Sequence, residues 1–140
     1  MVKPLLFTAM AATLALTMSF ADQPKGKVVI PAPRTDPTNG KMMHEAYCAP
    51  CHGSDGRGHG PMAAGLRVPP ADLTRLARAN QGKFPDARIV SVLRYGTDAH
   101  GSPEMPVWGT VFGRMSTPNR QEKDLRMTNL SRYLESLQAK

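Results

Sequence analysis

An all-α fold is predicted for this chain of 140 residues, and three observations support it. Residues 86–95 and the segment after Thr117-Pro118 each place apolar residues on one helical face. No stretch of useful length alternates apolar and polar residues, as a half-buried strand would. Loops rich in glycine and proline separate the candidate helices. The length is that of a single domain.

The first half of the chain is expected to contain a helix, a loop and a shorter helix. Asp36-Pro37 is a suitable start for the first helix, which runs toward Tyr47. Residues 53–61 hold four glycines and are expected to form an irregular loop. Residues 70–80 are expected to form a short helix.

The second half is expected to contain two better-defined helices. Residues 86–95 form the first, and Gly96 ends it. Residues 96–109 are expected to be a loop, because they include two prolines. The last helix starts at Thr117-Pro118, where a hydroxyl cap precedes a proline. Its apolar stripe consists of Leu130, Tyr133, Leu134 and Leu137.

The N-terminal segment has the pattern of a secretory signal. Lys3 is followed by an uncharged stretch over residues 4–21, with small residues before a cleavage site after Ala21. Residues 22–37 contain four prolines and are expected to form an extended strap, and residues 38–140 form the domain. The protein is therefore expected in the periplasm, with membrane association only if the segment is retained as an anchor.

The chain is basic, with a formal net charge of +7. Its lysines and arginines are scattered from Lys25 to Lys140, which is typical of a solvated surface rather than a nucleic-acid-binding stripe. We expect no nucleic-acid partner. A basic face that meets an acidic protein is expected instead, built from residues near the functional centre: Arg57, Arg67, Lys83 and Arg94.

The two cysteines of the chain form one motif, Cys48-Ala49-Pro50-Cys51-His52. This spacing is typical of covalent haem attachment. Each thiol can form a thioether with one vinyl group of the porphyrin, and the imidazole that follows can bind the iron. Cys48, Cys51 and His52 are therefore the predicted attachment residues for one haem c.

Three other interpretations of the cysteines explain less. A disulfide suits an exported chain but gives His52 no role. A thioredoxin-like pair would need a preceding strand and a βαβ context. A zinc site needs four ligands, and no second pair stands at metal-binding spacing.

The chain resembles the class I cytochrome c family, in particular bacterial single-haem domains also found fused to respiratory oxidases. The resemblance runs from about Gly40 to Leu137 and rests on three stretches in order: YCAPCHGSDGRGHGP, RYGTDAHGSPEMPVWG and SRYLESL. It implies a cytochrome c fold of three to four helices around the haem, with the first and last helices crossing. Gly40 and Tyr133 resemble the pair at that crossing. His44 stands where the family usually has an aromatic residue, and we expect it to stack on Tyr133.

The sixth iron ligand is predicted to be Met105. It lies between Pro103 and Pro106, which fix the backbone so that the thioether can point inward. The family resemblance implies the same, because its distal methionine also precedes a proline. Met115 and His100 remain alternatives.

Three further residues are assigned to the haem site. The resemblance implies that Pro61 lies where the family places the carbonyl that accepts the N–H of the bound imidazole. Tyr95 and Trp108 lie in the second matching stretch, and Trp108 follows Met105 closely enough to pack on the ring edge.

Electron transfer without substrate chemistry is the predicted function. No nucleophile–base pair or carboxylate dyad stands out. The expected partners are other redox proteins, including a respiratory complex or oxidase. A small peroxidase or a gas sensor is the alternative, and either would need an open sixth position.

Overall fold

The computed structural model describes residues 32–96, 106–116 and 120–139. They belong to one compact unit, Pro31–Lys140, and within them every regular element is helical and no strand occurs. The all-α prediction is confirmed. The predicted signal segment, Met105 and the predicted helix start at Thr117-Pro118 lie outside the described residues.

The first helical run extends from Gly40 to His52 as three successive elements. These are α1 (Gly40–Met43), a π-helical turn η1 (His44–Cys48) and α2 (Ala49–His52). The run begins at Gly40 because the side chain of Asn39 accepts the Met42 N–H at 2.9 Å, as an N-cap does. It therefore starts later than the predicted Asp36-Pro37 and continues beyond Tyr47.

Asp36 forms a turn in front of this helix instead of starting it. Its Oδ1 accepts the backbone N–H of Thr38 at 2.8 Å and the Thr38 hydroxyl at 2.7 Å. Asp side chains that bond to backbone two residues further on typically form such turns rather than continue a helix.

The middle of the chain contains 3₁₀ turns and one regular helix. The turns are η2 (Ala63–Gly65), η3 (Leu73–Arg75) and η4 (Arg78–Asn80), so the predicted continuous helix over 70–80 is wrong. Helix α3 (Asp86–Tyr95) has the predicted bounds. It ends at Gly96, whose φ of 75° is readily available to glycine.

Helix α4 (Trp108–Met115) was not predicted, and residues 108–109 belong to it rather than to the expected loop. Its sequence contains two glycines and two β-branched residues, which have low helix propensity. Burial stabilises it, because Phe112 is 0% exposed and Trp108 is 7% exposed. Helix α5 (Arg120–Ser136) follows as the last helix.

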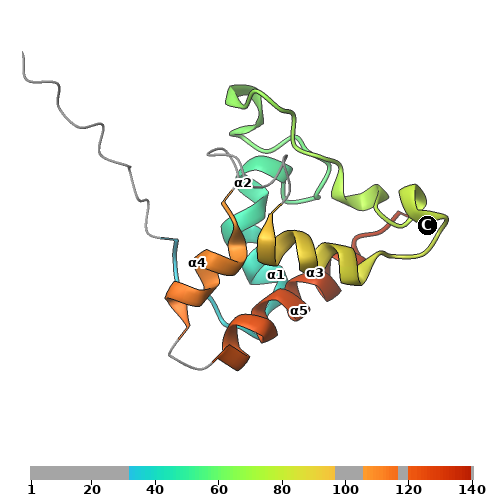
Figure 1. Cartoon of the computed structure of the whole chain (residues 1–140). Coiled ribbons are helices and arrows are strands. Elements are labelled where there is room, and N and C mark those ends of the chain that lie inside the picture. The colour runs from blue at the N-terminus through green and yellow to red at the C-terminus, as the bar shows by residue number, and fades with distance from the viewer. Residues whose placement is uncertain (1–31, 97–105, 117–119, 140) are drawn as a thin grey trace, which may run out of the picture. The chain divides into compact units, whose positions relative to one another are not determined.

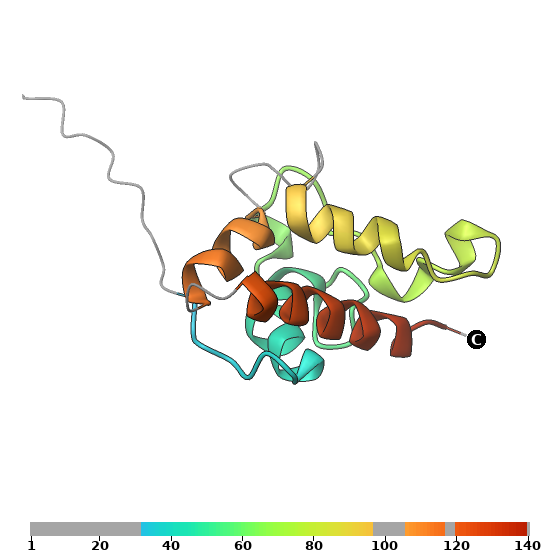
Figure 2. The same ribbon diagram turned by 60° about the horizontal axis from the view of Figure 1, so that its bottom comes forward.

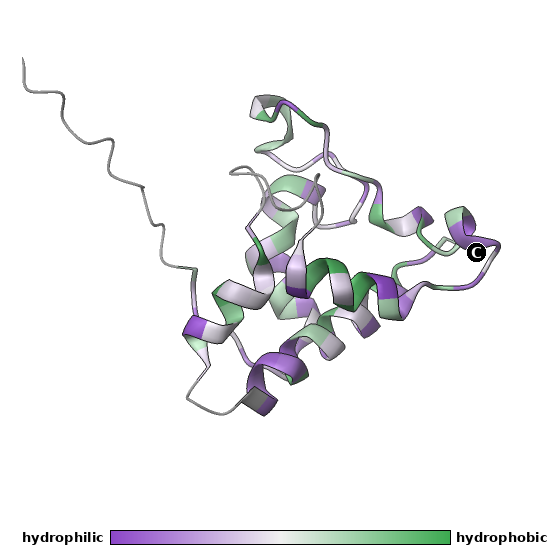
Figure 3. Ribbon diagram, in the orientation of Figure 1, coloured by the Kyte–Doolittle hydropathy of each residue, from purple (hydrophilic) through white to green (hydrophobic). Residues whose placement is uncertain are grey.

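The helices pack around α5. Figures 1 and 2 show α1, α3 and α4 arranged around it, and all three contact it. The rings of Tyr47, Trp108 and Phe112 form an aromatic cluster with centroids 5.2 to 5.5 Å apart. Figure 3 shows hydrophobic turns on α3 and a mainly hydrophilic start of α5. Within the described part of the chain, no helix has both the length and the apolar character that crossing a membrane requires.

The crossing of the first and last helices is confirmed. A Cβ atom on Gly40 would lie 2.8 Å from Cβ of Tyr133 and would collide with the carbonyl oxygen of Asn129. Only glycine therefore allows this close approach of α1 to α5. His44 stacks on Tyr133 as expected, with ring centroids 5.2 Å apart and a tilt of 51°.

Residues 32–37 are the part of the proline-rich strap that the structure describes. Hydrogen bonds attach them to the helices. The amide Nδ2 of Asn129 donates to the carbonyl of Pro37 at 3.1 Å. The hydroxyl of Tyr47 donates to the carbonyl of Pro33 at 2.6 Å. The strap thereby joins the first helical run to α5.

Replacing His44 with phenylalanine should flatten the pH dependence of stability below about pH 6.5, the usual histidine pKa. His44 is fully buried, and neither ring nitrogen has a hydrogen-bond partner within the described residues. Burial, and secondly the charge of His52, lowers the pKa of His44. Protons therefore bind the unfolded state more readily, so the free energy of unfolding falls as pH decreases through this range.

Chemical denaturation of the holoprotein between about pH 7 and pH 5 measures the effect. For one titrating group the slopes should differ by at most about 1.4 kcal/mol per pH unit. Phenylalanine keeps a ring against Tyr133, so packing is maintained. Equal slopes for His44→Phe and wild type would show that His44 does not contribute.

Candidate functional site

The two cysteines and His52 are placed by the π turn and α2. Cys48 closes the π turn and Cys51 and His52 end α2, so the three residues lie within about one turn of helix. In the π turn the Ala49 N–H donates to the carbonyl of His44, five residues earlier. Such a turn acts as a one-residue insertion in an α-helix and is common at functional sites.

Both thiols are free. Cys48 is 5% exposed, and burial raises the pKa of its thiol to about 12. Cys51 is half-buried, and burial also raises the pKa of its thiol. Addition of each S–H group across one vinyl group would form a thioether without loss of atoms.

The glycine-rich loop after His52 binds the end of the helix. The carbonyls of Ala49, Pro50, Cys51 and His52 would otherwise lack partners, because they are the last four of the helix. They accept the N–H groups of Gly53, Met62, Gly60 and Gly58, respectively, at 2.7 to 3.0 Å. The loop therefore folds back along α2 and fixes the segment that carries the three attachment residues.

Two glycines make this close return possible. A Cβ atom on Gly60 would lie 2.5 Å from the carbonyl oxygens of both Ala49 and Pro50. A Cβ atom on Gly58 would lie 2.5 Å from the carbonyl oxygen of Pro70, and the φ of Gly58 is 89°. The neighbouring atoms are backbone and cannot move aside, so these positions exclude larger residues.

His52 is held by a backbone carbonyl. Its Nδ1 lies 2.9 Å from the carbonyl oxygen of Ala71, and the ring is 4% exposed. A carbonyl oxygen can only accept, so Nδ1 carries the proton and Nε2 keeps its lone pair for a metal. Burial lowers the pKa of His52, which favours the neutral ring needed in a ligand.

The acceptor is Ala71 and not Pro61, so the prediction that Pro61 supplies this carbonyl is wrong. Pro61 is exposed at the end of the glycine loop. The chain returns to His52 only at Ala71, ten residues after Pro61. The segment that contains Pro69 and Pro70 first folds back onto Gly58. A backbone acceptor leaves no side-chain signature, so only the path of the chain could identify Ala71.

The other predicted site residues are dispersed. Trp108 is buried in the aromatic cluster, and its Nε1 has no hydrogen-bond partner in the described part of the chain. Tyr95, at the end of α3, is 72% exposed, with the guanidinium carbon of Arg94 6.0 Å from its ring centroid. Met105 lies outside the described residues, so the sixth ligand stays a prediction.

The donor set fits a covalently attached haem. Two free thiols stand three residues apart on one helical segment, and the imidazole directly after them presents Nε2 while its Nδ1 is bonded to protein. Metal-bound histidines characteristically have this second hydrogen bond, which fixes the ring orientation. The residues present are those that two thioethers and one axial iron ligand require.

A comparison with protein families agrees with this geometry. The family described as cytochrome C oxidase, cbb3-type, subunit III matches residues 35–117, which include the attachment motif and Ala71. No curated protein and no solved structure matches the chain. The match covers more than half of the sequence. The chain therefore belongs to this family of c-type cytochrome domains, and it binds one haem c covalently and transfers electrons through it.

Proposed function

We propose that this protein is a periplasmic single-haem electron carrier, which passes electrons between redox proteins and performs no substrate chemistry. The observation that carries the proposal is the bond from His52 Nδ1 to Ala71 in a helix that also presents two free thiols. When bound, haem c supplies a one-electron iron couple. The residues of the chain hold, orient and shield that group.

The chain holds His52 rigidly on what we call the proximal side of the haem site, the side on which His52 lies. The glycine loop fixes α2 through four backbone hydrogen bonds, and Ala71 fixes the imidazole. A rigid ligand lowers the structural change that accompanies gain or loss of an electron. The Ala71 carbonyl also increases the basicity of the ring, which favours the oxidised state of a bound iron.

Met105 is the sixth ligand in this proposal. Iron bound by a methionine as well as a histidine would have a higher reduction potential and no free position for a gas or peroxide. The main alternative, Met115, has its Sδ 3.7 Å from the hydroxyl oxygen of Tyr47, beside the strap. This contact supports a packing role for Met115 and leaves Met105 as the better ligand.

Replacing Met105 with leucine tests the proposal. In the Met105→Leu variant we expect loss of the weak long-wavelength methionine–iron band, a lower reduction potential and rapid binding of carbon monoxide by the reduced protein. The wild type should bind carbon monoxide poorly, because a protein ligand occupies the sixth position. Optical titration and potentiometry on the purified holoprotein give all three readouts.

Met115→Leu is the matched control and should resemble the wild type, because a leucine replaces a partly buried methionine with little change in volume. Exchanged results for the two variants would assign Met115 as the ligand. Rapid carbon monoxide binding by the wild type would contradict the carrier role and favour a gas sensor or peroxidase.

Export and the partner are parts of the same proposal. The pattern of residues 1–21 supports cleavage after Ala21 and transfer to the periplasm. The family description names a subunit of a cytochrome c oxidase, which supports a respiratory complex or oxidase as the electron acceptor. Isolation of the native protein should recover such a complex, whereas a haem-loaded form that retains Met1 would contradict cleavage.

A further inference from the structure

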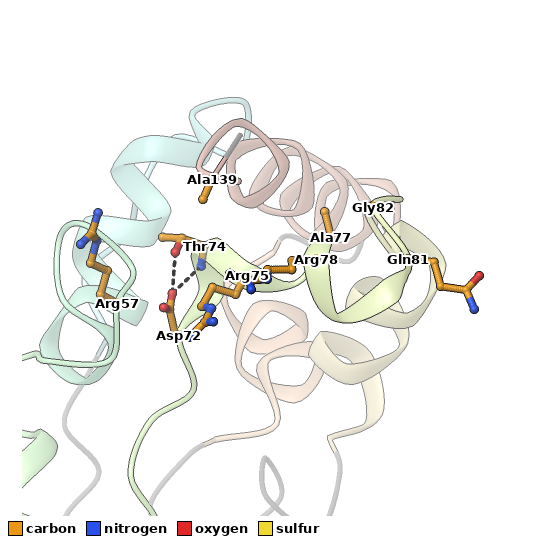
Figure 4. Close-up of a pocket in the computed structure, with 9 residues that line it drawn as sticks. All are labelled: Arg57, Asp72, Thr74, Arg75, Ala77, Arg78, Gln81, Gly82 and Ala139. Atoms are coloured by element: carbon orange, nitrogen blue, oxygen red, sulfur yellow. Dashed lines mark hydrogen bonds between the residues drawn. The ribbon is translucent and has the colours of Figure 1, made fainter.

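An arginine-lined groove lies beside the proximal side of the site. It has a volume of about 780 Å³, and its lining includes Arg57, Arg75 and Arg78. Figure 4 shows Arg57 on one side of the Asp72–Thr74 pair, and Arg75 and Arg78 on the other. Among the basic residues predicted for docking, Arg57 belongs to this groove, whereas Arg94 is paired with Asp124 at 2.9 Å.

Cations dominate the groove. Asp72 is the only carboxylate among the lining residues that the structure describes, and its side chain accepts hydrogen bonds within the chain. Its Oδ1 accepts the Thr74 hydroxyl at 2.6 Å and the Thr74 N–H at 2.9 Å. Arg57 meets Asp55 at 3.7 Å, but both side chains are more than half exposed, so this pair is weak. Arg75 and Arg57 also interact electrostatically with Asp72. Three arginines against one carboxylate still leave the described lining with a net positive charge that an incoming anion can use.

The wall of the groove is fixed before any ligand arrives. The side chain of Gln138 accepts the Ala77 N–H at 2.8 Å and donates to the carbonyl of Leu73 at 2.8 Å. The Ala139 N–H donates to the carbonyl of Thr74 at 2.9 Å. The end of the chain thus holds the segment that bears Arg75 and Arg78, which reduces the entropy cost of binding.

The groove is connected to the iron ligand through the backbone. Asp72 directly follows Ala71, whose carbonyl accepts the N–H of His52. On the other side, the Leu73 N–H donates to the carbonyl of Gly56 at 2.7 Å, next to Arg57. A partner seated here would approach the protein on the proximal side of the haem site.

We propose that this groove is a docking site for a carboxylate-rich segment of the redox partner, an inference that rests on the proposed function. Guanidinium groups bind carboxylates through paired, charge-assisted hydrogen bonds, and three of them line the groove. The concave shape suits an extended acidic segment better than a flat lipid surface. Electron-transfer contacts are small, so a compact charged groove is enough to orient the partner.

Charge reversal in the groove tests the proposal with a fluorescent octa-glutamate peptide as the probe. The variants are Arg75→Glu/Arg78→Glu and the control Arg114→Glu/Arg132→Glu. Both control positions are exposed on other elements, and the two variants have equal net charge. At low ionic strength the groove variant should bind the peptide at least about tenfold more weakly than wild type. The control should change affinity less than about twofold.

Two results would contradict the proposal. Equal weakening by both variants would show that overall charge, not the groove, binds the peptide. Groove-dependent binding of phosphatidylglycerol vesicles without binding of the peptide would assign the groove to lipid and overturn the proposal. If the reversed variant does not fold, Arg75→Gln/Arg78→Gln is compared with Arg114→Gln/Arg132→Gln. Peptide binding requires no redox turnover. A failure of peptide binding would therefore not contradict the electron-carrier function, and a failure of electron transfer would not affect the binding measurement.

Discussion

Replacing both cysteines with serine is expected to yield a colourless protein without covalent haem. The serine hydroxyl is a much weaker nucleophile than a thiol and does not form the thioether bonds that retain the group. Acid–acetone extraction should leave no haem on the Cys48→Ser/Cys51→Ser polypeptide. The intact mass of the wild type should equal residues 22–140 plus one haem, and that of the variant should lack the haem.

The control for this prediction is Ala49→Ser, which introduces a hydroxyl between the cysteines and leaves both thiols in place. It should carry the full amount of covalent haem. Each single serine variant should retain at most one thioether. Haem that survives extraction in the double variant would mean that another residue forms the covalent bond.

Loss of the haem should also lower stability. The chain has only eight aromatic residues in 140, so protein side chains alone build a small core. A covalent haem adds a large apolar surface that the folded state buries. The double serine variant should therefore unfold at a clearly lower denaturant concentration than Ala49→Ser, with circular dichroism as the measurement.

The features that sequence predicted well are those with short-range causes. The attachment motif depends on spacing within five residues, and Asp86–Tyr95 has an apolar face and a glycine stop. The crossing of Gly40 with Tyr133 is different, because it joins residues that lie far apart in the sequence. Only the family resemblance implied it. The stacking of His44 on Tyr133 was expected from the same resemblance, because His44 stands where the family usually has an aromatic residue.

The features that sequence missed depend on tertiary structure. Helix α4 has low intrinsic propensity and exists because Trp108 and Phe112 are buried against Tyr47. The π turn over His44–Cys48 has no side-chain pattern of its own. The bond from His52 to Ala71 joins residues 19 positions apart through a backbone atom, so no residue type marks the acceptor.

The second large effect is expected for Arg126→Ala, which should reduce the free energy of unfolding by about 2 to 3 kcal/mol. Arg126 lies on α5 and is only 3% exposed. Its Nη2 and Nε bond to Oε1 of Glu122 at 2.8 and 3.2 Å. Its Nη1 donates to the hydroxyl of Thr35 on the strap at 3.0 Å. Truncation therefore removes all three bonds, including both charge-assisted bonds to the Glu122 carboxylate, whose side chain is 25% exposed.

The bonds of Arg126 are part of a chain of hydrogen bonds between α5 and the first helical run. The Thr35 hydroxyl, which accepts from Arg126, lies 2.9 Å from the hydroxyl of Tyr47. Tyr47 in turn donates to the carbonyl of Pro33 at 2.6 Å. Loss of Arg126 thus weakens the attachment of the strap as well as the ion pair on α5. Thr35→Val should consequently cost less in the Arg126→Ala background than in the wild type.

Urea denaturation of the holoprotein, followed by haem absorbance and circular dichroism, measures these differences. Arg132→Ala is the matched control, because Arg132 is exposed on the same helix and the same atoms are deleted. It should change the free energy of unfolding by no more than about 0.5 kcal/mol. A folded domain is stable by only about 5 to 15 kcal/mol, so the loss of Arg126 should remove a substantial part of the total. Equal effects of the two truncations would show that the buried guanidinium contributes no more than an exposed one.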